Sequence, residues 1–190
     1  FDERLVARAP WIADIVADPP ATRLAALAHQ PGATLVTGRD LRLVLKRYRV
    51  PTSIFALLAD IPEAALESVL YSRTLSKGPA YNWYCRMRRF EHRIACTIAS
   101  DVRQYGQSIL PRFLSDRHMA MYSPEDWAIL PSARVAAGVS AWVSSHFVDD
   151  DGGRVKIYDF NMVRYAQWLE EHDIDHDDTA LDFWLTQNQA

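Results

Sequence analysis

The chain is poor in the residues that mark specialised protein classes. Among its 190 residues it has only two cysteines, seven glycines and ten prolines. These counts exclude a disulfide-dense scaffold, a collagen-like repeat and a low-complexity chain. No uncharged stretch reaches the roughly 18 apolar residues that a membrane-spanning helix needs. We therefore predict a soluble globular protein that folds as one ordinary domain or as two small ones.

The two cysteines are too far apart to bond to each other. Cys85 and Cys96 fall within one predicted helix, in which a separation of eleven residues is about 16 Å. The first residues, Phe1 to Arg4, include two acids and precede no long apolar run, so we expect no signal peptide. Scattered free thiols are typical of a reducing compartment, and we expect a cytoplasmic location.

Charge is unevenly distributed along the chain, although the net charge is only -3. Residues 37–93 carry eleven basic and five acidic side chains, whereas residues 119–190 carry four basic and thirteen acidic ones. A basic segment beside an acidic one indicates an anionic partner for the basic segment. A salt-bridged surface without such a partner explains the same counts equally well.

Hydrophobic periodicity predicts one helix after another, so the expected fold class is mainly α. One short β element is predicted at 155–158, where apolar and polar residues alternate. We expect an N-terminal helical arm over residues 1–36, three short helices over 37–80, a long connecting helix over 81–118 and a helical C-terminal region over 119–190.

Local signals place several helix starts. Thr37–Asp40 and Ser123–Asp126 both have the pattern of a capping box, in which a hydroxyl and an acid three residues later satisfy the first backbone donors. Asn161 or Asp159 is expected to cap the helix that follows the β element. Asp178 is expected to cap the last helix.

An apolar stripe runs along the longest periodic segment. Its members are spaced by three or four residues, as on one face of a helix of about 25 residues. The stripe consists of Trp83, Met87, Phe90, Ile94, Ile98, Val102 and Tyr105. A stripe of this kind is far more often a buried core or a helix-partner interface than a cofactor site.

The sequence offers little for catalysis or metal binding. His172 and His176 have the i,i+4 spacing of a helical metal pair, but no third ligand is suitably spaced and no Glu lies between them. No nucleophile elbow, phosphate loop or dinucleotide fingerprint occurs in the chain. We therefore expect no metal, no cofactor and no enzymatic activity, and an enzyme of unknown chemistry ranks only third among the hypotheses.

The three short helices match the requirements of a helix-turn-helix. Ala56 is the small residue that allows close helix crossing, Asp60 takes the tight turn, and Ile61 and Leu66 anchor the next helix. The expected core of this bundle consists of Leu41, Leu45, Val50, Phe55, Leu58 and Val69. From Arg39 to about Lys77 the chain resembles the phage-repressor type of helix-turn-helix. Asp60 stands where that family usually has Gly, and Asp tolerates a left-handed turn.

A second resemblance covers the C-terminal part. It rests on the segments Tyr122 to Trp127, Val155 to Phe160, and Tyr165 with Trp168, Leu169 and Trp184. In this arrangement the chain resembles the C-terminal domain of anti-CRISPR-associated repressors, which forms a homodimer. The resemblance implies that residues 119–190 are a dimerisation domain.

The helix-turn-helix resemblance implies a set of DNA contacts. The base-reading positions correspond to Glu63, Ala64, Ala65 and Ser68, and the phosphate-contacting positions to Thr52, Ser53, Arg73, Ser76 and Lys77. The reading positions offer few hydrogen bonds to bases, and Glu63 and Glu67 repel phosphate. The cations that offset this repulsion are Arg39, Arg42, Lys46, Arg47, Arg49, Arg73, Lys77, Arg86, Arg88, Arg89 and Arg93.

Together these features predict a homodimeric regulator, a repressor, that binds double-stranded DNA and no membrane. The alternative is a protein-protein interaction module with a degenerate helix-turn-helix that no longer reads DNA, in which Glu63 and Glu67 face a protein partner. The sequence leaves open whether RNA or another protein is also bound.

Overall fold

The computed structural model describes residues 36–75, 77–147 and 155–187. Within them the protein is mainly helical, with nine helices and one two-stranded sheet, which confirms the predicted fold class. The chain divides into two compact units at Arg88 and Arg89. The expected N-terminal arm lies outside the described residues except for Val36.

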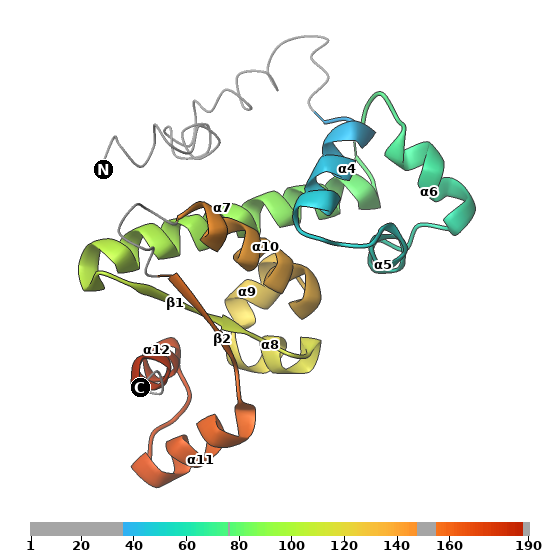
Figure 1. Cartoon of the computed structure of the whole chain (residues 1–190). Coiled ribbons are helices and arrows are strands. Elements are labelled where there is room, and N and C mark those ends of the chain that lie inside the picture. Colours follow the sequence, from blue (N-terminus) through green and yellow to red (C-terminus); the bar gives the residue numbers. More distant parts are fainter. Residues whose placement is uncertain (1–35, 76, 148–154, 188–190) are drawn as a thin grey trace. The chain divides into compact units, whose positions relative to one another are not determined.

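The first unit contains the three short helices that the sequence predicts (Figure 1). These are α4 (Gly38–Arg47), α5 (Thr52–Leu58) and α6 (Glu63–Leu70), and the start of α7 (Pro79–Tyr105) follows them. The buried apolar side chains of the three short helices and of the turns between them are those of Leu41, Val44, Leu45, Tyr48, Val50, Phe55, Ala56, Ala59 and Leu70. Most of the predicted bundle core is therefore buried, while Leu58 and Val69 are half-buried.

The start of α4 is a capping box, as predicted. The Asp40 backbone N–H donates to Thr37 Oγ1 at 3.2 Å, and the Thr37 backbone N–H donates to Asp40 Oδ2 at 2.8 Å. Two of the backbone donors at this helix end are thereby satisfied by side chains.

The first residue of α4 lies directly against the end of α6. The Gly38 backbone N–H donates to the Ser72 carbonyl at 2.9 Å, and a Cβ on Gly38 would collide with the Leu70 carbonyl oxygen. A second backbone hydrogen bond joins the same two segments, because the Leu75 N–H donates to the Val36 carbonyl at 2.7 Å. Only glycine permits so close an approach of one backbone to another.

The long helix α7 ends at Tyr105, the last residue of the apolar stripe, as the stripe predicts, but short of the predicted segment boundary at residue 118. Gly106 follows it with a positive φ of 73°, and its N–H donates to the Val102 carbonyl at 3.0 Å. Because glycine adopts this left-handed conformation readily, the helix stops there. The expectation of one helix over 81–118 is therefore wrong beyond Tyr105. Of the apolar stripe, the side chains of Met87, Phe90, Ile94 and Ile98 are buried.

The second unit contains one more strand than predicted. Strand β1 (Ser108–Arg112) pairs in parallel with β2 (Val155–Asp159), with Ser108 opposite Val155 and Arg112 opposite Asp159. The helices of this unit, besides the end of α7, are α8 (Asp116–Tyr122), α9 (Pro124–Ile129), α10 (Ala133–His146), α11 (Met162–His172) and α12 (Asp178–Gln187).

Aromatic side chains fill the core of the second unit. The ring of Phe160, directly after β2, lies 5.0 Å from that of Phe113 and 5.1 Å from that of Tyr122. Tyr165 on α11 and Trp184 on α12 are both buried, with ring centroids 5.2 Å apart. Edge-on and tilted pairs of this kind stabilise a core beyond the area that they bury.

Two helix caps of the second unit refine the sequence-based expectations. Asn161 caps α11, because its Oδ1 accepts from the Arg164 backbone N–H at 3.2 Å. At α12 the Ala180 backbone N–H donates to Asp177 Oδ1 at 2.6 Å. The cap is therefore Asp177, one residue before the predicted Asp178.

Candidate nucleic-acid interface

The turn between α5 and α6 has the geometry that the sequence predicts for a helix-turn-helix. Asp60 has a φ of 51°, in the left-handed region. The Ile61 N–H donates to the Ala56 carbonyl at 2.9 Å, and the Asp60 N–H to the Leu57 carbonyl at 3.3 Å. This pair of bonds is the Schellman pattern, which ends a helix and reverses the chain sharply. Ala56 is buried, as expected of the small crossing residue.

The turn between α4 and α5 repeats the pattern with a residue that sequence reasoning missed. Arg49 has a φ of 54°. The Val50 N–H donates to the Leu45 carbonyl at 2.8 Å, and the Arg49 N–H to the Lys46 carbonyl at 3.2 Å. The sequence has no glycine or asparagine at this turn. Leu45 and Val50, whose backbones are joined by the hydrogen bond, are both buried, and their burial stabilises the turn.

The predicted base-reading positions lie along the outer side of α6. Glu63, Ala64 and Ser68 are exposed, and Ala65 is half-buried. Glu67 is exposed as well, so the outer side of α6 carries two acidic residues and no basic residue. The helix offers one hydroxyl, two methyl groups and two carboxylates to a partner.

The predicted phosphate contacts at the start of α5 are accessible. Thr52 and Ser53 are both exposed in the first turn. Pro51 is the N-cap of this helix, and its side chain makes no capping hydrogen bond. Thr52 is therefore the first helical residue and does not serve as the N-cap.

The predicted contacts after α6 belong to the irregular segment between α6 and α7. Arg73 and Lys77 are exposed, and Lys77 has a φ of 83°. Ser76, between them, lies outside the described residues. The two cations extend the accessible positive charge beyond the end of α6.

The outer face of α4 carries three further basic side chains. Arg39 and Lys46 are exposed and Arg42 is half-buried, with spacings of three and four residues that place them on one side of the helix. None of the three forms an ion pair with any residue that the structure describes. Over residues 36–88 the chain has nine basic and four acidic side chains.

An exposed aromatic residue adjoins this basic face, and sequence reasoning missed it. Tyr71, directly after α6, is 69% exposed, and the guanidinium carbon of Arg42 lies 4.2 Å from the centre of its ring. A cation at this distance over an aromatic face is attracted to it. The two residues are 29 positions apart, and no local pattern in the sequence pairs them.

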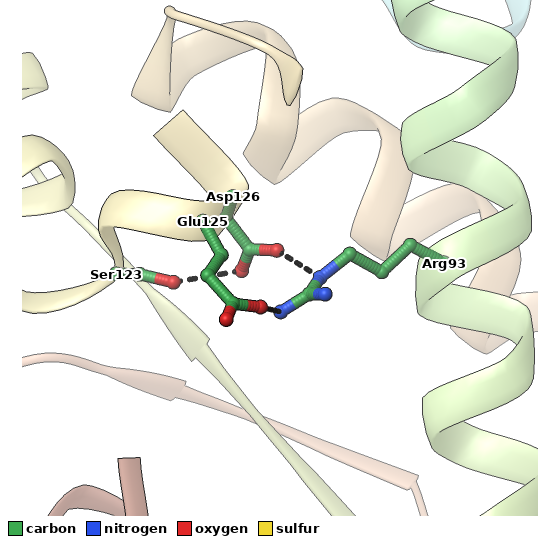
Figure 2. A network of polar contacts seen from close by, with 4 residues as sticks. All are labelled: Arg93, Ser123, Glu125 and Asp126. Atoms are coloured by element: carbon green, nitrogen blue, oxygen red, sulfur yellow. Dashed lines mark hydrogen bonds and ion pairs between the residues drawn. The ribbon is translucent and has the colours of Figure 1, made fainter. Parts of the chain in front are cut away.

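A polar network in the second unit has a structural role (Figure 2). Arg93 Nε lies 2.5 Å from Asp126 Oδ1, and its Nη2 lies 3.0 Å from Glu125 Oε2. Ser123 donates its hydroxyl to Asp126 Oδ2 at 2.9 Å. This side chain makes no capping hydrogen bond to the backbone of α9. The predicted capping box at Ser123–Asp126 is therefore wrong. Burial disfavours the charge of Arg93, but the attraction of the two carboxylates outweighs it and raises the pKa of Arg93 above its ordinary value.

A cavity of about 230 Å³ lies beside this network. Small side chains of α10, including Ala136 and Ala137, leave the space open, and Arg93 and Asp126 line it. Asp101, a further acid in its wall, accepts the Ser108 hydroxyl at 2.6 Å. These charged groups already bond within the protein, which gives the cavity little with which to orient a ligand.

The two histidines with metal-pair spacing, His172 and His176, each contact a different group of the protein. His172 Nδ1 lies 2.8 Å from the Trp168 carbonyl, and His176 Nδ1 lies 2.8 Å from the hydroxyl of Tyr165. In the part of the chain that the structure describes, no group of three His, Cys, Asp or Glu residues is placed to hold a metal ion.

No protein-family model and no curated protein matches this chain. Among the helices in the described ranges, none combines the length and the apolar character needed to cross a membrane.

Proposed function

We propose that the protein is a DNA-binding transcriptional regulator that acts as a homodimer through its helix-turn-helix. The observation that carries the proposal is the turn at Asp60, where a left-handed residue joins α5 to an accessible α6. This is the geometry with which a helix-turn-helix presents its second helix to the major groove.

The proposed mechanism is occlusion of a promoter. The α6 helices of the two subunits enter major grooves about 34 Å apart on a two-fold operator. The methyl groups of Ala64 and Ala65 contact thymine methyls, and Ser68 hydrogen-bonds to a base edge. Thr52, Ser53, Ser76 and the cations around the unit hold the phosphates, and these contacts supply most of the affinity.

The acids on α6 limit which sequences are bound. Glu63 and Glu67 repel phosphate, so they are tolerated only where they face base edges. A glutamate accepts a hydrogen bond from the amino group of cytosine in the major groove. We therefore expect an operator with cytosine opposite Glu63.

A gel-shift series on genomic fragments tests the proposal. The wild type should shift specific fragments at micromolar protein and low salt. Ala65→Gln should change the preference among fragments, because a larger side chain clashes close to a base. Arg73→Glu with Lys77→Glu should weaken binding to all fragments alike. Absence of any shifted fragment for the wild type would contradict the proposal.

A protein-interaction module is the second candidate, and one observation favours it. Leu57, an apolar side chain on α5, is 78% exposed, and α6 of the same unit carries two exposed acids. In this alternative Glu67→Lys abolishes recovery of a protein complex in a pull-down and leaves the thermal midpoint of unfolding nearly unchanged, as expected for an exposed substitution. The same variant should leave DNA binding absent, as in the wild type.

A further inference from the structure

Tyr71 is exposed, yet its backbone is held in place on both sides. Its N–H donates to the Glu67 carbonyl at 3.0 Å. The next residue, Ser72, accepts from Gly38 N–H at 2.9 Å and donates its hydroxyl to the Val69 carbonyl at 2.8 Å. A large aromatic side chain with a fixed backbone loses little conformational freedom when it binds a partner.

One face of the Tyr71 ring is occupied and the other is open. The Arg42 guanidinium covers one face at 4.2 Å, and Arg42 Nη1 is buried without a hydrogen-bond partner. Since 69% of Tyr71 is exposed, the remaining face meets solvent. The guanidinium therefore stabilises the ring through one face and leaves the other face free to stack on a second planar group.

The charge around this open face is positive on the α4 side. Arg39 and Lys46 lie one turn to either side of Arg42, and they are about 10 Å apart along the helix axis at 1.5 Å per residue. Arg73 follows Tyr71 by two residues and is exposed. The acid Glu67 lies one turn before Tyr71 on α6, so an anionic partner is expected over α4.

We propose that Tyr71 and the basic face of α4 bind single-stranded DNA. An unpaired base stacks on the open face of Tyr71, while Arg39 and Lys46 contact the adjoining phosphates. Exposed aromatic rings beside a basic groove are the means by which proteins hold single strands without reading their sequence. A duplex offers no free base face, because its bases stack on one another. The open face of Tyr71 therefore serves this site alone, whereas the cations of α4 are shared with the duplex-binding surface of the proposed function.

Fluorescence anisotropy with a labelled dT oligonucleotide tests the proposal on the full chain. Tyr71→Ala should weaken binding about tenfold, the size expected when one stacked base is lost. Tyr71→Phe keeps the ring and should bind as the wild type does. An abasic oligonucleotide of the same length is the matched ligand control, and Tyr71→Ala should not change its affinity. Thermal unfolding of each variant checks that the fold is retained.

The charged half of the site is tested separately. Arg39→Glu with Lys46→Glu should weaken binding to the dT and the abasic oligonucleotides alike, because both carry the same phosphates. Equal dT affinity for the wild type and folded Tyr71→Ala would overturn the proposal, and so would an equal loss with the abasic strand. Binding of dT by a wild type that shifts no duplex would support this site and contradict the proposed function.

Discussion

Asp60 combines an unfavourable backbone conformation with an exposed position at the turn between α5 and α6. A side chain in the left-handed region places Cβ too close to the backbone, at a cost of about 1 kcal/mol that is smaller for Asp than for other residues. Asp60→Gly should therefore raise the free energy of unfolding by about 0.5 kcal/mol, measured by urea denaturation. Asp60→Ala, which keeps Cβ and lacks the polar side chain, should lower it.

A single ion pair couples the two strands at the end of the sheet. Arg112 donates from Nε to Asp159 Oδ1 and from Nη2 to Asp159 Oδ2, the latter at 2.7 Å, and these hydrogen bonds lower the pKa of Asp159 below its ordinary value of 3.8. Because the folded state favours the carboxylate, the contribution of the pair is present above about pH 4 and is lost as the pH falls through the lowered pKa. The pair is exposed, so this contribution is small.

A carboxyl NMR titration checks this prediction directly. Asp159 should titrate below 3.8 in the wild type, and Arg112→Ala should return its pKa toward that value. An unchanged Asp159 titration in Arg112→Ala would show that the pair does not form in solution.

At the scale of elements, the packing of α4 against the end of α6 depends on Gly38. A Cβ at this position meets the backbone oxygen of Leu70, which cannot move aside as a flexible side chain would. Gly38→Ala should therefore lower the free energy of unfolding by about 2 kcal/mol, the typical cost of overpacking. Ser68→Ala on the exposed side of α6 is the matched control and should change it by less than about 0.5 kcal/mol. Equal denaturation midpoints for the two variants would contradict this account.

Elements that depend on neighbouring residues were predictable, and those that depend on distant ones were not. The Thr37 capping box and the Asp60 turn follow from a few adjacent residues, and both form as predicted. Strand β1 contains Pro111, which removes a ladder donor and hides the strand pattern. It forms because β2, 47 residues later, pairs with it.

The same distinction holds for the candidate sites. The exposure of Glu63, Ala64 and Ser68 follows from helical periodicity, so the sequence could place them on one accessible side. The pairing of Arg42 with Tyr71 requires the end of α6 to lie against α4. That contact is tertiary, and sequence spacing contains no signal for it.

At the scale of the whole molecule, the proposed homodimer needs an apolar surface that the second unit leaves uncovered. Tyr165, Trp168 and Trp184, which motivated the prediction, are buried within the unit itself. Val163 and Phe183 remain exposed, at 60% and 53%. Dimerisation stays a prediction, and these two side chains are its candidate contacts.

Multi-angle light scattering tests the dimer. The wild type should have the mass of two chains at tens of micromolar, and Phe183→Ser should raise the dimer Kd at least about tenfold, as expected when an aromatic anchor is removed. Leu57→Ser, at an exposed apolar position of the first unit, is the matched control and should leave the mass unchanged. A monomeric wild type would remove the dimer and weaken the regulator proposal with it.

Binding of duplex DNA by the whole molecule should depend steeply on salt. The α6 helix offers few hydrogen bonds to bases, so affinity must come from cations that release counterions from phosphates. Each neutralised phosphate contributes a slope of about -0.9 in log K against log salt concentration.

Arg73→Gln with Lys77→Gln should reduce the slope by about 0.9 for every phosphate that the variant no longer neutralises, whereas Arg134→Gln on α10 should leave it unchanged. Titrations from low to moderate salt measure the slope. A flat dependence for the wild type would show that phosphate neutralisation does not supply the affinity, and an unaltered slope in the double variant would remove Arg73 and Lys77 from the interface.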